Sequence, residues 1–386
     1  MIDEASTAFD TIFGGRPTAC GLAPGRVEIL GNHTDYNGGC VLTAAIDRHI
    51  VVVGRPRSGD EACVHSLAMD AGSRFSVRAP ARDPAAAWAD YVKGVIALLL
   101  ETGVEVPAFE AVIASDLPVG SGLSSSAALE AATAHFLGVL TPLTIEPTEL
   151  ALLLQRAENE FVGVRCGILD QFSAIHGRAD HVLFLDCATL DHEKLNLGDS
   201  PPAIVLCDTQ TPRSLAGGPY NTRRAECEQA VRLLGKALGR PINGLCEVTA
   251  EELRRVEAGL PENLGNRTRH VIEENQRVLQ ARDALRAGRS SDLGRLMRAS
   301  HESSRVNFEN STEDLDRLCR IAADQPGCIG SRLCGAGWGG CTVNLVAPAA
   351  VEGFRSAIAS GFQAETGRAP VIHVCRAADG ARTVAL

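Results

Sequence analysis

The sequence lacks the features that would direct the protein to a membrane or to nucleic acid. It has no run of about 18 apolar residues, so we expect no transmembrane helix. The first fifteen residues begin with acidic side chains and contain no hydrophobic segment of the signal-peptide type. Basic residues are in deficit, with a formal net charge of −10, which argues against nucleic acid or an acidic membrane as a partner.

A CxxC pair is also missing, although the chain has thirteen cysteines. They are scattered, odd in number and mostly set within apolar runs, so we expect neither a disulfide framework nor a zinc site. Free, buried thiols in a reducing compartment fit this distribution better. We therefore expect a cytoplasmic protein.

The most distinctive stretch, 116–130 (DLPVGSGLSSSAALE), is not one of the two best-known phosphate loops. It has no lysine at its end, as GxxxxGK[ST] requires, and it is not a GxGxxG followed by an acidic residue about 20 positions later. Gly120 and Gly122 nevertheless allow close approach of a ligand to the backbone, and three serines follow where a helix begins with unpaired N–H groups. The stretch predicts anion binding, with a triphosphate as the natural ligand. A serine-capped helix after a glycine turn is the alternative.

The length of 386 residues predicts two domains. We place their boundary at the proline pair 201–202, which gives domains of residues 1–200 and 201–386. Apolar residues repeat with helical or strand periodicity along most of the chain. Helices are expected over 88–100, 127–140, 148–162, 267–288, 293–308 and 313–323, and strands over 26–30, 41–53, 109–115, 181–187 and 203–208.

Polar residues gather in three further places. The segment 31–39 offers donors and acceptors that suit a polyol, although Asn, Asp and Gly also favour plain turns. Glu158 interrupts the apolar face of helix 148–162, and a buried carboxylate needs a salt bridge or a divalent cation. Asp170 follows a Gly-Ile-Leu turn, where a helix N-cap is a common role.

Taken together, the motifs resemble those of the galactokinases, within the GHMP superfamily of small-molecule kinases. Three superfamily motifs occur in order: APGRVEILGNHTDYNGG (23–39), LPVGSGLSSSAA (117–128) and GAGWGGC (335–341). Four more stretches resemble galactokinases specifically: WADYVKGV (88–95), CGILDQF (166–172), YNTRR (220–224) and RHVIEENQRV (269–278).

The resemblance implies a fold and an activity. The expected fold is α+β, the two-domain GHMP kinase fold, with the phosphate loop in the N-terminal domain, a ferredoxin-like C-terminal domain and the active site between them. The expected reaction is transfer of a phosphoryl group from ATP to the C1-hydroxyl of α-D-galactose with Mg²⁺. The expected partners are ATP and a sugar, bound by a monomer.

The resemblance also assigns roles residue by residue. The catalytic pair would be Asp170, as general base, and Arg26. Magnesium would be held by Ser126 and Glu158. The sugar would contact Asn32, His33, Thr34, Asp35, Gly167 and Tyr220. ATP would contact Gly120, Ser121, Gly122, Leu123, Ser124, Ser125, Ser126 and, on a weaker match, Ser66, with the third motif helping to hold the phosphate loop.

The chain departs from the family signature at two positions. Galactokinases usually have Asn at the position of Glu28 and Glu at the position of Asn32, so the two residues are exchanged here. One hypothesis is that carboxylate and amide have traded places within one hydrogen-bond network, which leaves galactose the substrate. A second is that loss of the charge at Asn32 admits galacturonate. N-acetylgalactosamine, arabinose and a non-catalytic sugar sensor are further alternatives.

Overall fold

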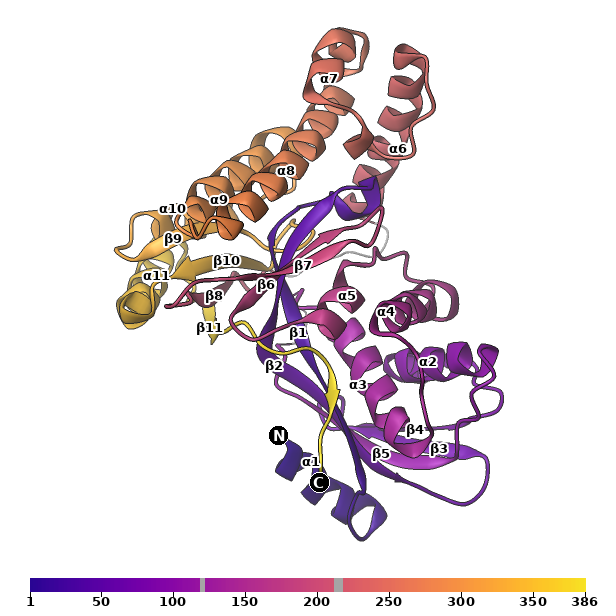
Figure 1. Cartoon of the computed structure of the whole chain (residues 1–386). Coiled ribbons are helices and arrows are strands. Elements are labelled where there is room, and N and C mark those ends of the chain that lie inside the picture. The colour runs from indigo at the N-terminus through magenta and orange to yellow at the C-terminus, as the bar shows by residue number, and fades with distance from the viewer. Residues whose placement is uncertain (119–121, 212–217) are drawn as a thin grey trace.

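The computed structural model describes residues 1–118, 122–211 and 218–386, and the chain forms two β-sheets, each covered by helices (Figure 1). Gly120 and Ser121 of the expected phosphate loop lie outside the described residues. The expected α+β class is confirmed. None of the helices in the described ranges is long and apolar enough to cross a bilayer.

The first sheet has eight strands among the described residues. Its main path runs β12-β1-β2-β5-β3-β4, and β6 and β7 extend it from β2. β2 is long enough to pair with β6 through residues 40–43 and with β5 through residues 50–56. The strands are β1 (Ala19–Leu30), β2 (Cys40–Pro56), β3 (Glu61–Ser66), β4 (Ala71–Ser76), β5 (Phe109–Ser115), β6 (His181–Asp186), β7 (His192–Asn196) and β12 (Arg382–Thr383).

Helices cover both faces of this sheet. α1 (Ile2–Phe13) packs through Phe9 on one face, against alternate residues of β1, β2 and β5. The opposite face carries α2 (Asp90–Glu101), α3 (Ser125–Leu140), α4 (Pro147–Arg156) and α5 (Leu169–His176), as Figure 1 shows. α3 approaches β1 so closely that a Cβ at Gly21 would lie 2.0 Å from the carbonyl oxygen of Ala132.

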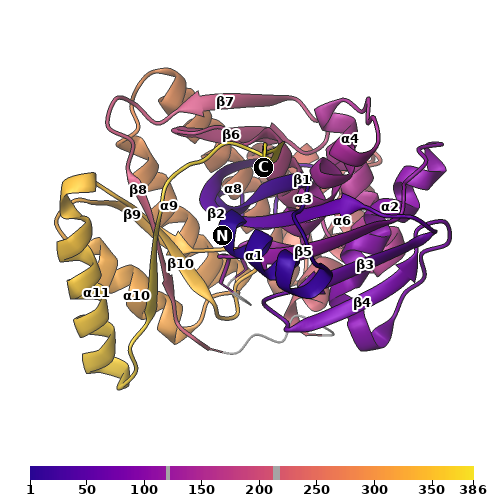
Figure 2. The ribbon, with the colours of Figure 1, turned by 90° about the horizontal axis from the view of Figure 1, so that it is seen from below.

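The second sheet is antiparallel, with the order β11-β8-β10-β9. Its strands are β8 (Ala203–Asp208), β9 (Cys328–Leu333), β10 (Cys341–Val346) and β11 (Val371–Cys375). α10 (Glu313–Ala323) and α11 (Val351–Thr366) lie side by side against it (Figure 2), and they bury Leu318, Phe354 and Phe362 on Val205. This strand order is the expected ferredoxin-like layout.

Further helices join the second sheet to the first. They are α6 (Pro219–Leu238), α7 (Ala250–Val256), α8 (Glu262–Arg286) and α9 (Asp292–Ser303), and α6 to α8 share a core that includes Leu234, Leu253, Val271 and Phe308. Short 3₁₀ turns lie at Asp35–Asn37, Pro84–Ala89, Leu245–Glu247, Glu257–Gly259 and Pro348–Ala350.

Two expected helices end earlier than their apolar spacing indicates. Helix 148–162 is α4 followed by a π-helical turn at Ala157–Val162, and helix 293–308 is α9 followed by a π-helical turn at Ser304–Phe308. A π turn inserts one residue into the helical repeat, which rotates the side chains that follow. In both places it sets polar residues of the site described below: Glu158 and Ser304.

The strand membership supports a proposal for the domain boundary. β7 of the first sheet ends at Asn196 and β8 of the second begins at Ala203. We propose that the boundary lies between them, near residue 200. The C-terminal strand β12 returns to the first sheet, where it pairs with β1.

Candidate active site

A cavity of about 590 Å³ lies where the two parts of the chain meet. This volume is typical of small-molecule sites. Its walls come from β1, the loop after β1, the π turn that follows α4, the segment before α5, the start of α6 and the loop after β9. The lining residues include Arg26, Glu28, Asn32, His33, Asp35, Tyr36, Glu158, Gly167, Asp170, Tyr220, Gly335 and Ala336.

Arg26 and Asp170 form an ion pair on the cavity wall. Arg26 donates from Nε (2.8 Å) and Nη2 (2.5 Å) to Asp170 Oδ1. Asp170 Oδ2 accepts from the Ser124 hydroxyl at 2.6 Å. Asp170 is the second residue of α5, whose N-cap is Ile168, so the N-cap alternative is wrong. Within residues 1–118, 122–211 and 218–386 this is the one hydrogen bond that Oδ2 accepts, which leaves a lone pair for another hydroxyl.

The described part of the glycine- and serine-rich loop lies beside this pair. Arg26 Nη1 donates to the carbonyl oxygen of Gly122 (2.7 Å), and the backbone N–H of Arg26 donates to that of Leu123 (3.1 Å). Ser124 has φ +59° and directly precedes α3, so Ser125 and Ser126 are its first residues. The helix N-terminus and its unpaired N–H groups therefore lie close to the ion pair.

Ser126 and Glu158 lie together, as a shared metal ion would need. The Ser126 side chain lies near enough to Glu158 to lower the pKa of that carboxyl, and Gln171 Nε2 donates to Glu158 Oε2 (2.6 Å) and to Glu130 Oε2 (3.1 Å). Glu158 is only 4% exposed. Burial, helped by the charge of Asp170, raises its pKa to about 7. Within the described ranges no ion pair neutralises Glu158 and no group of three or more His, Cys, Asp or Glu side chains could hold a metal ion, so a divalent cation here would depend on this one carboxylate, the Ser126 hydroxyl and ligands from outside the protein.

The loop after β1 contributes aromatic and acidic groups. His33 stacks on Phe308 with ring centroids 4.3 Å apart. Burial lowers the pKa of His33 to about 3, so the ring is neutral. His33 Nε2 then donates to the carbonyl oxygen of Ala336 (3.0 Å), and Nδ1 accepts from the Tyr36 hydroxyl (2.9 Å). His33 therefore offers the cavity a ring face rather than a free nitrogen.

Asp35 depends on the glycine opposite. A Cβ at Gly167 would lie 2.1 Å from Asp35 Oδ2, so a larger residue at position 167 would displace this carboxylate. Burial, and next the charge of Glu28, raises the pKa of Asp35 to about 6. Tyr220 closes the same side, with its ring centroid 6.0 Å from that of Tyr36.

Two residues assigned from the resemblance do not reach the cavity. Thr34 is fully buried, and its single hydroxyl proton lies between the carbonyl oxygens of Gly31 (2.8 Å from Oγ1) and Cys40 (2.7 Å). Ser66 is buried on β3, where its hydroxyl oxygen accepts from the backbone N–H of Met69 (3.4 Å). Thr34 shapes the loop, and Ser66 lies in another part of the first sheet.

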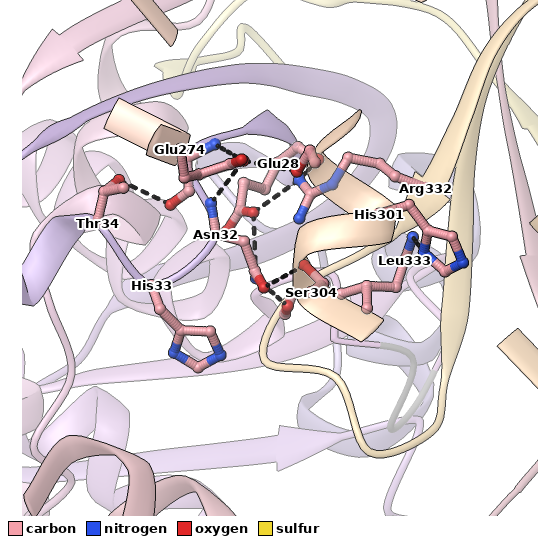
Figure 3. Close-up of polar contacts among 12 residues, drawn as sticks. Glu28, Asn32, His33, Thr34, Glu274, His301, Ser304, Arg332 and Leu333 are labelled. Carbon is pink, nitrogen blue, oxygen red and sulfur yellow. Dashed lines mark hydrogen bonds and ion pairs between the residues drawn. The ribbon is translucent and has the colours of Figure 1, made fainter. Parts of the chain in front are cut away.

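Sequence reasoning missed several groups at the site. Arg332 forms an ion pair with Glu28 (2.8 Å), and Glu274 accepts from the backbone N–H groups of Gly31 (2.9 Å) and Asn32 (3.3 Å). Both come from the second half of the chain, as Figure 3 shows. Their sequence signal was faint: Arg332 precedes the third motif, and Glu274 lies within RHVIEENQRV.

Family models match most of the chain. The galactokinase galactose-binding signature matches residues 7–56, the GHMP kinase N-terminal domain residues 90–178 and the GHMP kinase C-terminal domain residues 281–364. A galactokinase of a Roseiflexus species is 45% identical over 382 residues, which cover 98% of this chain and 97% of the relative. Human galactokinase is 38% identical and covers 100% of this chain and 97% of its own length.

Solved structures show the same similarity. Galactokinase of Lactococcus lactis, solved with galactose, superimposes with a TM-score of 0.92 at 33% identity, over 100% of both chains. Mevalonate kinase of Methanococcus jannaschii gives a TM-score of 0.67 at 18% identity, over 94% of this chain and 99% of that one. The second likeness concerns the fold alone.

Proposed function

This chain belongs to the galactokinase family of the GHMP kinases, and from that premise we propose that it phosphorylates the C1-hydroxyl of α-D-galactose with ATP. The products are galactose 1-phosphate and ADP. The observation that carries the proposal is the Arg26–Asp170 pair, which faces the cavity beside the loop that precedes α3.

Asp170 acts as the general base. The C1-hydroxyl hydrogen bonds to Asp170 Oδ2 and passes its proton there as its oxygen bonds to the γ-phosphorus. The bond between that phosphorus and the bridging oxygen breaks, and ADP leaves. Arg26 orients the carboxylate through Oδ1, where its Nε and Nη2 donors both bind. Positioning and charge supply most of the rate enhancement in such transfers.

Magnesium accompanies ATP in this proposal. Ser126 and Glu158 would hold it, because a buried carboxylate and a hydroxyl meet there without a cationic side chain in the described ranges. When bound, the ion neutralises charge on the phosphate oxygens. The N-terminus of α3 supports the same phosphates through its unpaired N–H groups.

Galactose is proposed over galacturonate because Glu28, Asp35 and Asp170 all bring carboxylates to the cavity. A second carboxylate on the sugar would meet like charges at close range. A monomer and a cytoplasmic location stay predictions; thirteen free thiols support a reducing compartment.

An ADP-release assay with Mg-ATP tests the proposal against galactose, galacturonate, N-acetylgalactosamine, arabinose, glucose and mevalonate. We expect the highest kcat/KM for galactose, and a phosphorus NMR spectrum of the product with coupling to the anomeric proton. A higher kcat/KM for another sugar would replace the substrate. ATP binding without turnover of any sugar would favour the sensor alternative.

A further inference from the structure

The exchange of Glu28 and Asn32 changes which residue can contact the sugar. Asn32 lines the cavity but is only 1% exposed, and all of its side-chain hydrogen-bonding capacity is used (Figure 3). Nδ2 donates to Gly335 O (2.7 Å) and Glu28 Oε1 (3.4 Å). Oδ1 accepts from Asn310 Nδ2 (2.8 Å) and the Ser304 hydroxyl (3.3 Å). An amide has two donors and two lone pairs, so Asn32 has none left for a substrate.

Glu28 has the capacity that Asn32 lacks. Its Oε1 accepts from Arg332 Nη1 (2.8 Å) and from Asn32. Its Oε2 has no hydrogen-bond partner in residues 1–118, 122–211 or 218–386. The side chain lines the cavity and keeps 9% of its surface exposed. One oxygen is therefore held by the protein and the other is free to accept a hydrogen bond.

Arg332 holds this carboxylate in place. The Arg332 side chain is completely buried on β9, and within the described ranges its ion pair is with Glu28. Its Nε and Nη2 have no hydrogen-bond partner there. A buried guanidinium whose other donors lack partners depends on this ion pair, so Arg332 fixes the position of Glu28 Oε1.

The position of Glu28 along β1 places it one sugar ring away from the catalytic pair. Arg26 and Glu28 are two residues apart in a segment of regular register with β2, so their side chains point to one face. Two residues of a strand span about 7 Å. A pyranose whose C1-hydroxyl meets Asp170 would therefore turn its remote side, with the C3, C4 and C6 positions, toward Glu28.

We infer that Glu28 is the specificity-determining residue of the sugar site: its Oε2 accepts a hydrogen bond from a hydroxyl on the side of the sugar remote from C1. Asn32 and Arg332 are positioning residues that fix Oε1. The inference rests on the proposed function, and it moves the negative charge of this subsite from position 32 to position 28. The same charge disfavours sugars that carry a carboxylate.

The test compares wild type with Glu28→Gln on galactose and on its 3-, 4- and 6-deoxy derivatives. We expect Glu28→Gln to lower kcat/KM for galactose about 10- to 100-fold, mainly through KM, as loss of a hydrogen bond to a charged group does. KM for ATP should change less than about twofold. One of the three deoxysugars lacks the hydroxyl that Glu28 binds. For that sugar, the fold-decrease in kcat/KM caused by Glu28→Gln should be about tenfold smaller than for galactose.

Charge gives a second readout. Glu28→Gln should narrow the preference for galactose over galacturonate about tenfold, whereas Glu28→Asp should keep that preference and still raise KM for galactose. Glu28→Asp also preserves the pair with Arg332, so it serves if the Gln variant does not fold. Glu302→Gln, which removes an exposed carboxylate paired with Arg305, is the matched control.

The outcomes are separable. If wild type does not phosphorylate galactose, the proposed function fails. If wild type does, but the variants lose the same factor on galactose and on all three deoxysugars, Glu28 has only a structural role and the inference fails. A loss of kcat/KM that is about tenfold smaller on one deoxysugar than on galactose, with unchanged KM for ATP, supports it.

Discussion

At the scale of single residues, the geometry of Asp170 gives the most direct prediction. Asp170→Asn removes the proton acceptor and the charge that faces Arg26, while it preserves the shape of the side chain. We expect kcat to fall about 10²- to 10⁴-fold, the usual contribution of a general base. ATP binding, measured by calorimetry, should persist. Asp199→Asn, at an exposed aspartate, is the control, and kcat within about threefold of wild type in Asp170→Asn would contradict the assignment.

Asp35 gives a prediction that depends on pH. Burial, then the charge of Glu28, raises the pKa of Asp35 from 3.8 to about 6, so the folded state binds the proton more tightly than the unfolded chain. Asp35 thus stabilises the fold fully only below about pH 4, and this contribution is lost as pH rises through about 6. Asp35→Asn should therefore raise the free energy of unfolding at pH 8, by at most about 3 kcal/mol.

Urea unfolding at pH 4, 6 and 8 measures this effect. The increase in the free energy of unfolding of Asp35→Asn over wild type should be largest at pH 8 and vanish near pH 4. An equal increase at pH 4 and pH 8 would contradict the prediction. The same variant should raise KM for the sugar, because the carboxylate lines the cavity. A site residue that lowers stability while it serves binding is a known trade-off.

The residues of the site were predictable to different degrees. Arg26 and Asp170 are 144 positions apart, yet each lies in a motif, and the structure brings them together. Asn32 also lies in a motif. The sequence could not show that Ser304, Asn310 and Gly335 take up the hydrogen bonds of its side-chain amide. Those partners arrive from distant elements, and only the tertiary structure decides which hydrogen bonds of a side chain remain free.

At the scale of elements, the contact between β1 and α3 sets a strict steric limit. A Cβ at Gly21 would lie 2.0 Å from Ala132 O and 2.4 Å from Phe136 N, which are backbone atoms that cannot yield locally. Gly21→Ala should push α3, and with it Ser125 and Ser126, away from the sheet. We expect the free energy of unfolding to fall by more than about 3 kcal/mol, with a clear loss of kcat.

Gly353→Ala is the matched control for that substitution. Gly353 lies in α11, and a Cβ there would meet no atom within 4 Å. Because glycine weakens a helix interior relative to alanine, this change should stabilise the protein by about 0.5 to 1 kcal/mol. Denaturant unfolding compares the two variants directly. If Gly21→Ala and Gly353→Ala change the free energy of unfolding by similar amounts and with the same sign, the β1–α3 contact does not require glycine at position 21.

Most element positions followed from periodicity, and the exceptions have a physical cause. Apolar spacing gave the helices at 88–100 and 313–323 to within two residues of α2 and α10. It did not reveal the π turns at Ala157–Val162 and Ser304–Phe308, because one inserted residue barely disturbs an apolar pattern. Those turns set the directions of the Glu158 and Ser304 side chains. Periodicity therefore predicted the backbone least well at the site itself.

At the scale of the whole molecule, the second half of the chain holds the end of β1 and the loop that follows it in the first half. Glu274 of α8, Arg332 of β9 and Asn310 all bind residues 28–32. The motif order required the two halves to meet, and the fold class followed from the resemblance. The hydrogen bonds between the two halves could not be predicted in this way, because they join residues more than 240 positions apart. The site exists only when both sheets are folded.

The C-terminal tail extends this dependence to the first sheet, and it gives the last prediction. Backbone N–H groups of Ala378, Gly380, Ala381 and Val384 donate to Ala45, Gly177, Ala174 and Cys20, and β12 pairs with β1. The two ends of the chain lie near each other in both views (Figures 1 and 2). Deletion of residues 378–386 therefore exposes the edge of β1, although these residues follow the second sheet in sequence.

We expect this deletion to lower the free energy of unfolding by about 2 to 5 kcal/mol, since each lost hydrogen bond contributes about 0.5 to 1.5 kcal/mol. Amide hydrogen exchange should quicken in β1 and α5 while β8 and β10 stay protected. Deletion of residues 385–386 alone, which are exposed, should change neither. Equal effects of the two deletions, or loss of protection in the second sheet first, would mean that the tail does not support β1. Because β1 carries Arg26 and Glu28, loss of protection confined to this strand should be accompanied by a higher KM for the sugar.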